Sequence, residues 1–196
     1  MRKTFFWSLL AAGLAAQTPA LGQADSAALR VIHARKSVRH FTGAAVSRDQ
    51  LETILRAGMA APTAVNKQPW SFVVVTGRAK LDSLAQGLPY AAMLRQAGAA
   101  IVVCALPGQA FHKQEAFAVI DCSLASENIL LAAEALGLGA LWTECYPEQE
   151  VMGFVRKRLG IPADVIPLNV IPVGQPAGED KPKDKYRAEK IHWEAW

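Results

Sequence analysis

The spacing of apolar residues along the chain predicts helices interspersed with strands. In several segments apolar side chains recur every three or four residues, which is the pattern of a helix with one buried face. Shorter runs rich in Val, Ile and Ala are typical of buried strands. Because helices and strands do not alternate regularly, the pattern favours an α+β fold with a mixed sheet over a doubly wound one. The predicted helices span 25–36, 47–61, 78–86, 89–97, 114–136 and 148–159, and the predicted strands span 71–76, 99–105, 140–143 and 165–173.

Local signals refine some of these elements. Ser47, with Gln50 three residues later, matches a capping box at the start of a helix. The segment 114–136 is apolar on most faces and rich in Ala and Ser, so we expect a long helix at the centre of the fold. Pro167 and Pro172 lack a backbone donor, which predicts that the last strand lies at an edge or pairs irregularly.

The chain changes character from residue 176 onward. This tail is rich in Gly, Pro and Lys and then carries Ile191, Trp193 and Trp196 near its end. Large apolar side chains on a polar tail are unfavourable in water and make good anchors on another protein surface. The tail is therefore predicted to cross onto a partner subunit.

The first residues have the pattern of a secretory signal peptide. Arg2 and Lys3 precede an uncharged apolar run over 5–16, and small residues follow at 22–24. The run is too short to span a bilayer comfortably, so no stable membrane insertion is expected once it is removed. The prediction is a removable signal over 1–24, one folded domain over 25–196, and export to the periplasm. An uncleaved membrane anchor and a mistaken start codon are the alternatives.

The charge of the remaining chain gives no support for a nucleic-acid partner. Without the signal segment the chain has 19 basic and 17 acidic side chains, a net charge of +2, which is too small for such a partner. The cations are clustered locally instead, which favours a small anionic ligand. Cys104, Cys122 and Cys145 form no C-x-x-C pair and no Cys/His metal spacing, so we expect neither a disulfide nor a metal site.

Two short segments carry the candidate chemistry. Residues 35–39 read R-K-S-V-R, three cations and a hydroxyl that can bind a phosphate. Residues 61–70 read A-P-T-A-V-N-K-Q-P-W, a stiff loop between two prolines. Its amides, Asn66 and Gln68, can donate and accept at once, as recognition of a ring with carbonyl and N–H groups requires. Each segment also has an ordinary interpretation, namely a solvated basic helix end and a turn capped by its own side chain.

Other chemical patterns are weak or missing. The G-L-G at 137–139 falls short of a dinucleotide fingerprint and fits helix termination and close packing. No serine stands in a G-x-S-x-G elbow. Asp121, Glu127 and Glu134 on the long helix are interpreted as structural polar positions rather than an acid/base pair. Without a set of proton-relay residues, the sequence suits a reaction whose difficult step belongs to a bound cofactor.

Taken together, these segments resemble the flavin-dependent nitroreductase superfamily. The resemblance runs from about Ile32 to the C-terminus, and it implies a nitroreductase-like α+β fold, an intertwined homodimer with two FMN sites at the interface, and a tail that crosses to the partner. The motifs that carry it are R-K-S-V-R at 35–39, A-P-T-A-V-N-K-Q-P-W at 61–70, D-C-S-L-A-S-E-N-I-L-L-A-A at 121–133, G-L-G-A-L-W at 137–142 and P-K-D-K-Y…I-H-W at 182–193.

The resemblance implies roles for individual cations. Arg35, Lys36 and Ser37 match positions that hold the FMN phosphate and ribityl chain. Arg39 matches a cation near flavin N1 and O2, where it would stabilise negative charge on the reduced ring. Two cations in the tail match residues that reach the phosphate, although alone they form an ordinary solvated charge cluster. These are Lys183 and Lys185.

Further residues match the surroundings of the flavin ring. Thr143 and Glu144 fall where backbone N–H groups approach N5 and O4, and Cys145 stands where a glycine is often found. The loop that contacts the ring, largely from the second subunit, is matched by Pro62, Thr63, Ala64 and Asn66.

The implied function is an FMN-dependent oxidoreductase. It passes a hydride from NAD(P)H through flavin N5 to an electron-poor small molecule such as a nitroaromatic or a quinone. No side chain is expected to act as a catalytic acid or base, because the flavin carries the chemistry. The alternatives are a specialised reductive dehalogenase or flavin-modifying enzyme of the same fold, and a non-catalytic flavin-binding protein of the cell envelope.

Overall fold

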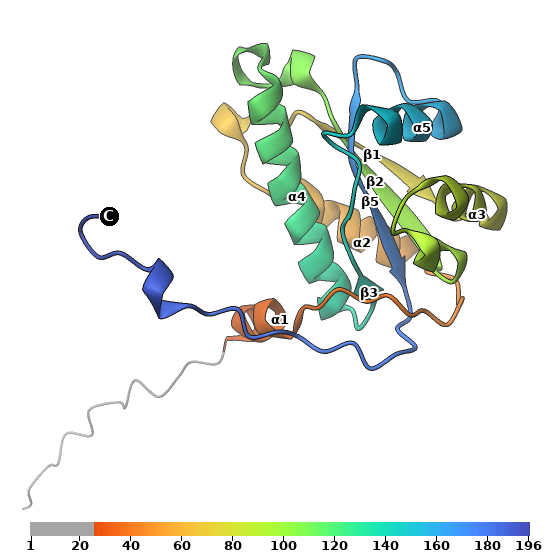
Figure 1. The fold of residues 1–196 in the computed structure, drawn as a ribbon, viewed down its shortest axis with the longest axis horizontal. Helices are drawn as coiled ribbons and strands as arrows, with labels where there is room; N and C mark the ends of the chain where they lie inside the picture. Colours follow the sequence, from red (N-terminus) through yellow and green to blue (C-terminus); the bar gives the residue numbers. More distant parts are fainter. Residues whose placement is uncertain (1–25) are drawn as a thin grey trace, which may run out of the picture.

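The computed structural model describes residues 26–196. The predicted signal segment, 1–24, lies outside the described residues. A central sheet stands between two pairs of helices (Figure 1): α2 and α4 pack together on one face, and α3 and α5 on the other. The α-helices are α1 (Ala27–Ala34), α2 (Arg48–Met59), α3 (Arg78–Gly87), α4 (Glu115–Ala135) and α5 (Gln149–Leu159).

The strands pair antiparallel in the order β1-β2-β5-β3, and the short β4 also pairs with β5. A separate parallel bridge joins Ser37 to Ala140 in β3. The two inner strands, β2 and β5, are buried along their whole length and form the centre of the core. The α+β prediction with a mixed sheet and a long central helix is thus confirmed. The strands are β1 (Trp70–Val75), β2 (Ala99–Ala105), β3 (Gly139–Ala140), β4 (Thr143–Glu144) and β5 (Ile166–Gly174).

The prolines of β5 do not place it at an edge, so that part of the prediction is wrong. Instead, β5 pairs irregularly with its neighbours, and this irregular pairing accommodates both prolines. The register between β2 and β5 shifts next to Pro167, which leaves Leu168 as an extra residue. On the other side of β5, Pro172 faces the gap between β3 and β4, where no ladder bond is needed from it. The single strand predicted over 140–143 is accordingly split in two.

Two predicted helices are shorter than expected. The segment 89–97 forms only the 3₁₀ turn Ala92–Arg95. Its buried residues, Ala91, Leu94 and Ala97, are spaced by three, which is the period of a 3₁₀ helix rather than an α-helix. Helix α1 ends at Ala34, because the backbone is already extended at residue 35.

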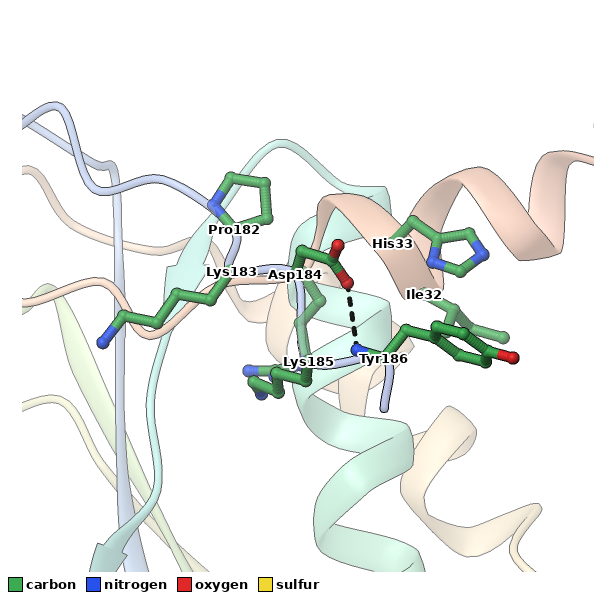
Figure 2. Close-up of a pocket in the computed structure, with 8 residues that line it drawn as sticks. Ile32, His33, Pro182, Lys183, Asp184, Lys185 and Tyr186 are labelled. Carbon is green, nitrogen blue, oxygen red and sulfur yellow. Dashed lines mark hydrogen bonds between the residues drawn. The ribbon is translucent and has the colours of Figure 1, made fainter. Parts of the chain in front are cut away.

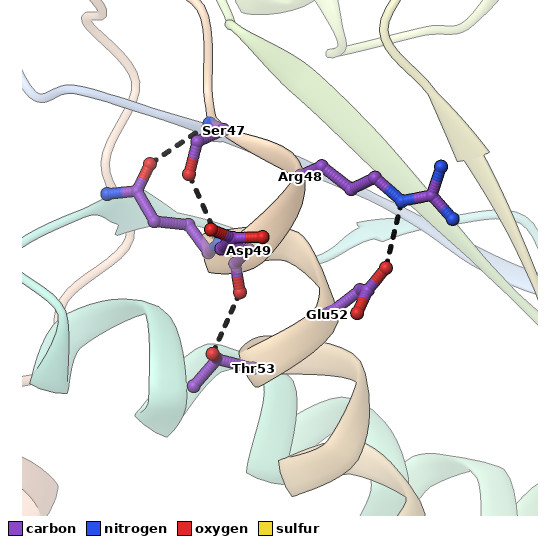
Figure 3. Close-up of polar contacts among 6 residues, drawn as sticks. Ser47, Arg48, Asp49, Glu52 and Thr53 are labelled. Atoms are coloured by element: carbon purple, nitrogen blue, oxygen red, sulfur yellow. Dashed lines mark hydrogen bonds and ion pairs between the residues drawn. The ribbon is translucent and has the colours of Figure 1, made fainter.

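Helix α2 begins where the sequence predicts it. The Ser47 hydroxyl accepts a hydrogen bond from the Gln50 N–H at 3.2 Å, and the Gln50 side chain accepts one from the Ser47 N–H at 3.0 Å (Figure 3). The predicted capping box is thus confirmed. On the exposed side of the first turn, Arg48 and Glu52 form an ion pair at 2.9 Å.

Helix α4 is the central helix. Among the described residues it is the one helix long and apolar enough to cross a membrane by length and composition. Its contacts with α2 and β2 make it a core helix of this fold instead. The approach to α2 is close: a Cβ at Gly58 would lie 2.9 Å from Ile129. The two candidate segments, 61–70 and 35–39, contact different parts of α4, at Asp121 and at Glu127 and Glu134.

Candidate functional site

The cation segment, residues 35–39, is extended rather than helical. The N–H of Val38 donates to the carbonyl of Ala140 at 3.1 Å, and the Val38 side chain is buried. The side chains of Arg35 and Arg39 nevertheless line the same cavity. The two arginines therefore share a side for a reason other than the helical spacing expected from the sequence.

A glycine permits this close approach of the cation segment to β3. A Cβ on Gly139 would lie 2.6 Å from the Val38 side chain, inside contact distance. At the end of α4, Gly137 has a left-handed φ of 69°, which only glycine adopts without strain. The G-L-G of 137–139 thus serves helix termination and close packing, as its pattern predicts.

The tail returns to the cation segment directly after β5, where Pro176 forms a bridge with Phe41. The Asp180 carboxylate accepts a hydrogen bond from the backbone N–H of Arg39 at 2.9 Å, and the N–H of Ala177 donates to the carbonyl of His40 at 2.9 Å. These contacts bring residues 177–185 beside residues 35–40. Cations from both ends of the chain therefore meet.

A cavity of about 620 Å³, here called the cation cavity, lies between these two segments. Six of its ten lining residues are Lys or Arg and two are acidic, so it suits an anion such as a phosphate. Lys181 is a lining residue that our sequence analysis did not single out, although it belongs to the same K-P-K-D-K run as Lys183 and Lys185. The lining residues are Arg35, Lys36, Ser37, Arg39, Glu179, Asp180, Lys181, Pro182, Lys183 and Lys185.

The tail also closes against α1. A second hollow of about 510 Å³ lies there, and Figure 2 shows the ring of Tyr186 beside Ile32. The N–H of Tyr186 donates to the Asp184 carboxylate at 2.9 Å, which folds the tail back on itself. Lys183 and Lys185 precede this turn.

Two of the cations are attached to α4. The Lys36 ammonium lies 3.1 Å from both carboxylate oxygens of Glu134, and the Arg35 guanidinium lies 3.4 Å from Glu127. In the part of the chain that the structure describes, no carboxylate forms an ion pair with the remaining cations that our sequence analysis names. These are Arg39, Lys183 and Lys185.

The Pro62 loop, defined here as residues 61–70, has an unusual backbone. Val65, Asn66 and Gln68 have φ values of 44°, 57° and 50°. The left-handed region is rare for residues other than glycine and costs on the order of 1–3 kcal/mol each, most for a β-branched residue. The Thr63 hydroxyl accepts a bond from the Gln68 N–H at 3.1 Å, and the amide of Gln68 donates to that of Asn66 at 2.9 Å.

This loop is attached to the other half of α4. The N–H of Ala64 lies 3.2 and 3.3 Å from the two carboxylate oxygens of Asp121. Asp121 precedes Glu127, the partner of Arg35, by six residues and Glu134 by thirteen. At 1.5 Å per residue these separations are about 9 and about 20 Å along the helix. The Pro62 loop and the cation segment therefore contact different parts of α4 (Figure 1). Within one chain, the structure does not bring them together.

A third hollow of about 510 Å³, here called the ring hollow, adjoins the cation cavity through Arg39, which lines both. Thr143 and Glu144 line it too, and the Thr143 hydroxyl bonds to the Val170 carbonyl. Trp142, Tyr90 and the other aromatic and apolar residues of its wall were not predicted as site residues from the sequence. The lining residues are Arg39, Pro89, Tyr90, Leu141, Trp142, Thr143, Glu144, Pro147, Glu148 and Val151.

Cys145 points away from this hollow, into the core. Its N–H and that of Tyr146 both donate to the carbonyl of Leu168, at 3.1 and 3.0 Å, where the β2–β5 register shifts. Burial raises the pKa of the Cys145 thiol to about 12. The same cause raises the pKa of Cys104 and of Cys122 to about 12. At neutral pH all three remain thiols.

The sequence matches a model described as the nitroreductase family over residues 32–88 and 83–175, which is most of the chain. The chain belongs to the nitroreductase family. Lys183 and Lys185 lie beyond the matched residues, so their assignment depends on the cation cavity.

Similar proteins agree with this family. A relative from Methanothermobacter thermautotrophicus, named "Putative NADH dehydrogenase/NAD(P)H nitroreductase", is 41% identical over 86% of this chain and 87% of its own length. A solved structure of the same name from Bacteroides thetaiotaomicron is 48% identical, with a TM-score of 0.82 over 87% of this chain and 99% of that one. An FMN-dependent nitroreductase structure from Clostridium difficile is 25% identical, with a TM-score of 0.78 over 86% and 99%.

These relatives contradict the prediction of an exported, periplasmic protein, which is wrong. They are similar over 86–87% of this chain and are named for NAD(P)H, a reductant that the cell keeps in the cytoplasm. The error arose from a short apolar N-terminal run, which was interpreted without regard to where the reductant is found. That run is within 1–24, outside the described residues.

Proposed function

We propose that this nitroreductase-family protein is an FMN-dependent NAD(P)H oxidoreductase that works as a homodimer. The functional unit is the single domain predicted over 25–196. One observation carries the proposal: Arg39 lines both the cation cavity and the ring hollow. A phosphate site and a site for a flat ring therefore adjoin, as binding of FMN requires.

The cation cavity fits the phosphate end of FMN. The side chains of Arg39, Lys183 and Lys185 form no ion pair among the described residues, so their charges are available to an anion. Arg35 and Lys36 lie in the same cavity with their orientation set by Glu127 and Glu134. Ser37 adds a hydroxyl to this wall. We assign four of these cations to the phosphate or the chain next to it, namely Arg35, Lys36, Lys183 and Lys185, whereas Arg39 lies where the ring would begin.

The ring hollow fits the isoalloxazine. Arg39 would place a positive charge beside N1 and O2, where a fixed cation in a site shielded from water stabilises negative charge. Thr143 and Glu144 would present the backbone to N5 and O4. The pairing of β4 with β5 holds that backbone in place.

The Pro62 loop would come from the second copy. It is attached at Asp121, whereas the cation segment is attached at Glu127 and Glu134, about 9 and 20 Å further along α4. This separation within one chain supports a subunit interface as the place where Pro62, Thr63, Ala64 and Asn66 reach an FMN. The exposed side of α4 supports such an interface. Ile120 and Leu124, one turn apart, are 56% and 42% exposed, and an uncovered apolar face of this kind fits a second copy of the chain.

FMN supplies the redox chemistry when it is bound, by taking and giving a hydride at N5. The residues of the chain hold and orient it: cations bind the phosphate, Arg39 balances charge, and the loop amides of Asn66 and Gln68 offer hydrogen bonds and help exclude water. No side-chain acid or base is assigned. The names of the relatives support reductase activity over a merely flavin-binding protein.

We infer that the acceptor is a flat, electron-poor small molecule such as a nitroaromatic or a quinone. Trp142 and Tyr90 in the wall of the ring hollow support this class, because aromatic walls stack on planar acceptors.

The test is the visible spectrum of the purified protein after reconstitution with FMN. We expect flavin bands, bleaching by NADH or NADPH without oxygen, and their return when a nitroaromatic or quinone is added. Protein that binds no FMN, or whose bound FMN is not bleached by either nucleotide, would contradict the proposed function.

A further inference from the structure

Asp121 lies in α4, and the function proposed above gives it no role. The residue is only 3% exposed, and no ion pair joins its carboxylate to another described residue. The contact that the structure gives it is the N–H of Ala64, shared between both oxygens. A buried carboxylate that faces one neutral donor is costly, because no opposite charge replaces its lost hydration. The burial of Asp121 therefore does not stabilise the helix, and its presence requires another explanation.

The other side of the contact is the strained Pro62 loop. Val65, the most strained of its residues, is also 67% exposed, so packing in this chain does not hold it. The bonds of Gln68 to Thr63 and Asn66 are internal to the loop. Among the described residues, the Asp121 contact is the one hydrogen bond that ties residues 63–67 to another element.

We propose that Asp121 is a positioning residue that holds the Pro62 loop in the conformation that binds FMN. The ligand in this inference rests on the proposed function, whereas the ordering of the loop does not. Without the anchor, residues 63–67 relax out of the left-handed region. FMN must then order the loop as it binds, and the affinity falls by that cost.

The position of the Ala64 N–H between the two Asp121 oxygens also predicts which substitutions of Asp121 are tolerated. Both oxygens lie at nearly the same distance from the Ala64 N–H, so one acceptor oxygen is enough. Asp121→Asn keeps such an oxygen and should keep the loop in place, whereas Asp121→Ala removes it. Ser123→Ala is the matched control, because the Ser123 hydroxyl bonds within α4, to the carbonyl of Val119.

The first measurement is hydrogen exchange of peptides covering 61–70, without FMN. We expect slow exchange in wild type, Asp121→Asn and Ser123→Ala, and exchange at least tenfold faster in Asp121→Ala. If Asp121→Ala does not fold, Ala64→Pro removes the same bond from the loop side. Thr63 before it is already extended, with φ −138° and ψ 156°, as a residue preceding proline prefers.

The second measurement is the FMN dissociation constant, from quenching of flavin fluorescence. Losing a bond to a charged group predicts affinity weaker by about tenfold or more in Asp121→Ala, with recovery to within about threefold in Asp121→Asn. Unchanged exchange in Asp121→Ala would overturn the proposal, as would faster exchange with unchanged affinity. A lower melting temperature as the sole effect would make Asp121 merely structural. If wild type binds no FMN, the proposed function fails, and the exchange result still decides whether Asp121 anchors the loop.

Discussion

The Asp180 carboxylate and the backbone N–H of Arg39 are 2.9 Å apart, although 141 residues separate them in the chain. This hydrogen bond fixes the returning tail beside the cation segment. Its removal is expected to leave the sheet intact, because both residues lie outside the strands.

The Asp180 contact predicts opposite effects for two substitutions. Asp180→Asn keeps an acceptor and removes a negative charge from the cation cavity, so FMN should bind as tightly as in wild type or more tightly. Asp180→Ala also removes the anchor, and we expect it to bind about two- to tenfold more weakly than Asp180→Asn, the range for one hydrogen bond. Fluorescence titration measures both. Equal affinity of the two variants would show that the anchor does not order the cavity.

The tail cations should recognise the phosphate and not the ring. Lys185→Gln is expected to weaken FMN binding by about tenfold, as loss of a charge-assisted bond does. Binding of riboflavin, which has no phosphate, should be unchanged, and FMN affinity should fall as salt is added. Lys157→Gln on α5 is the control. An equal loss of riboflavin affinity would show that Lys185 does not act on the phosphate.

The exposed apolar side of α4 should be needed for dimerisation. Leu124→Arg places a charge on this face, and we expect a monomer by light scattering together with loss of FMN binding. Lys157→Glu, a charge change on the exposed side of α5, should leave a dimer. If Leu124→Arg remains a dimer with normal flavin content, this result would argue against an FMN site shared between two subunits.

The three buried thiols predict a pH dependence. Their pKa is raised by burial from 9.0 to about 12, so the folded state holds protons that the unfolded state releases above pH 9. Their contribution to stability is thus complete below pH 9 and is lost as the pH rises from 9 towards 12.

At pH 8 the folded protein should not react with a disulfide reagent, since the thiolate is the reactive form. Three thiols per chain should react in denaturant. Fast labelling of Cys145 in the folded protein would contradict its buried position.

How much the sequence predicts differs between the fold and the site. The β-branched run of β2 and the capping box of Ser47 are local signals, and the structure confirms both. The central place of β5 depends on a register shift beside Pro167, which arises only when the strands pair. The two prolines therefore predicted either an edge strand or irregular pairing, and composition alone could not decide between them.

For the site, the residue types were predictable and their arrangement was not. Arg35 and Arg39 do line one cavity, but on an extended segment whose path depends on the contact between Val38 and Gly139. Asp121 was interpreted from sequence as a structural polar position. Its contact with the Pro62 loop joins residues 57 positions apart, and no local pattern contains that information.

The most direct test of the central claim is the flavin content of a mixed dimer, in which one subunit carries Arg39→Glu and the other carries Asn66→Trp. Each homodimer of these variants has two damaged sites and should bind no FMN. In the mixed dimer one site receives both changes and the other receives neither, so we predict one FMN per dimer, against two in wild type. A mixed dimer that binds no FMN while wild type binds two would contradict a site shared between subunits.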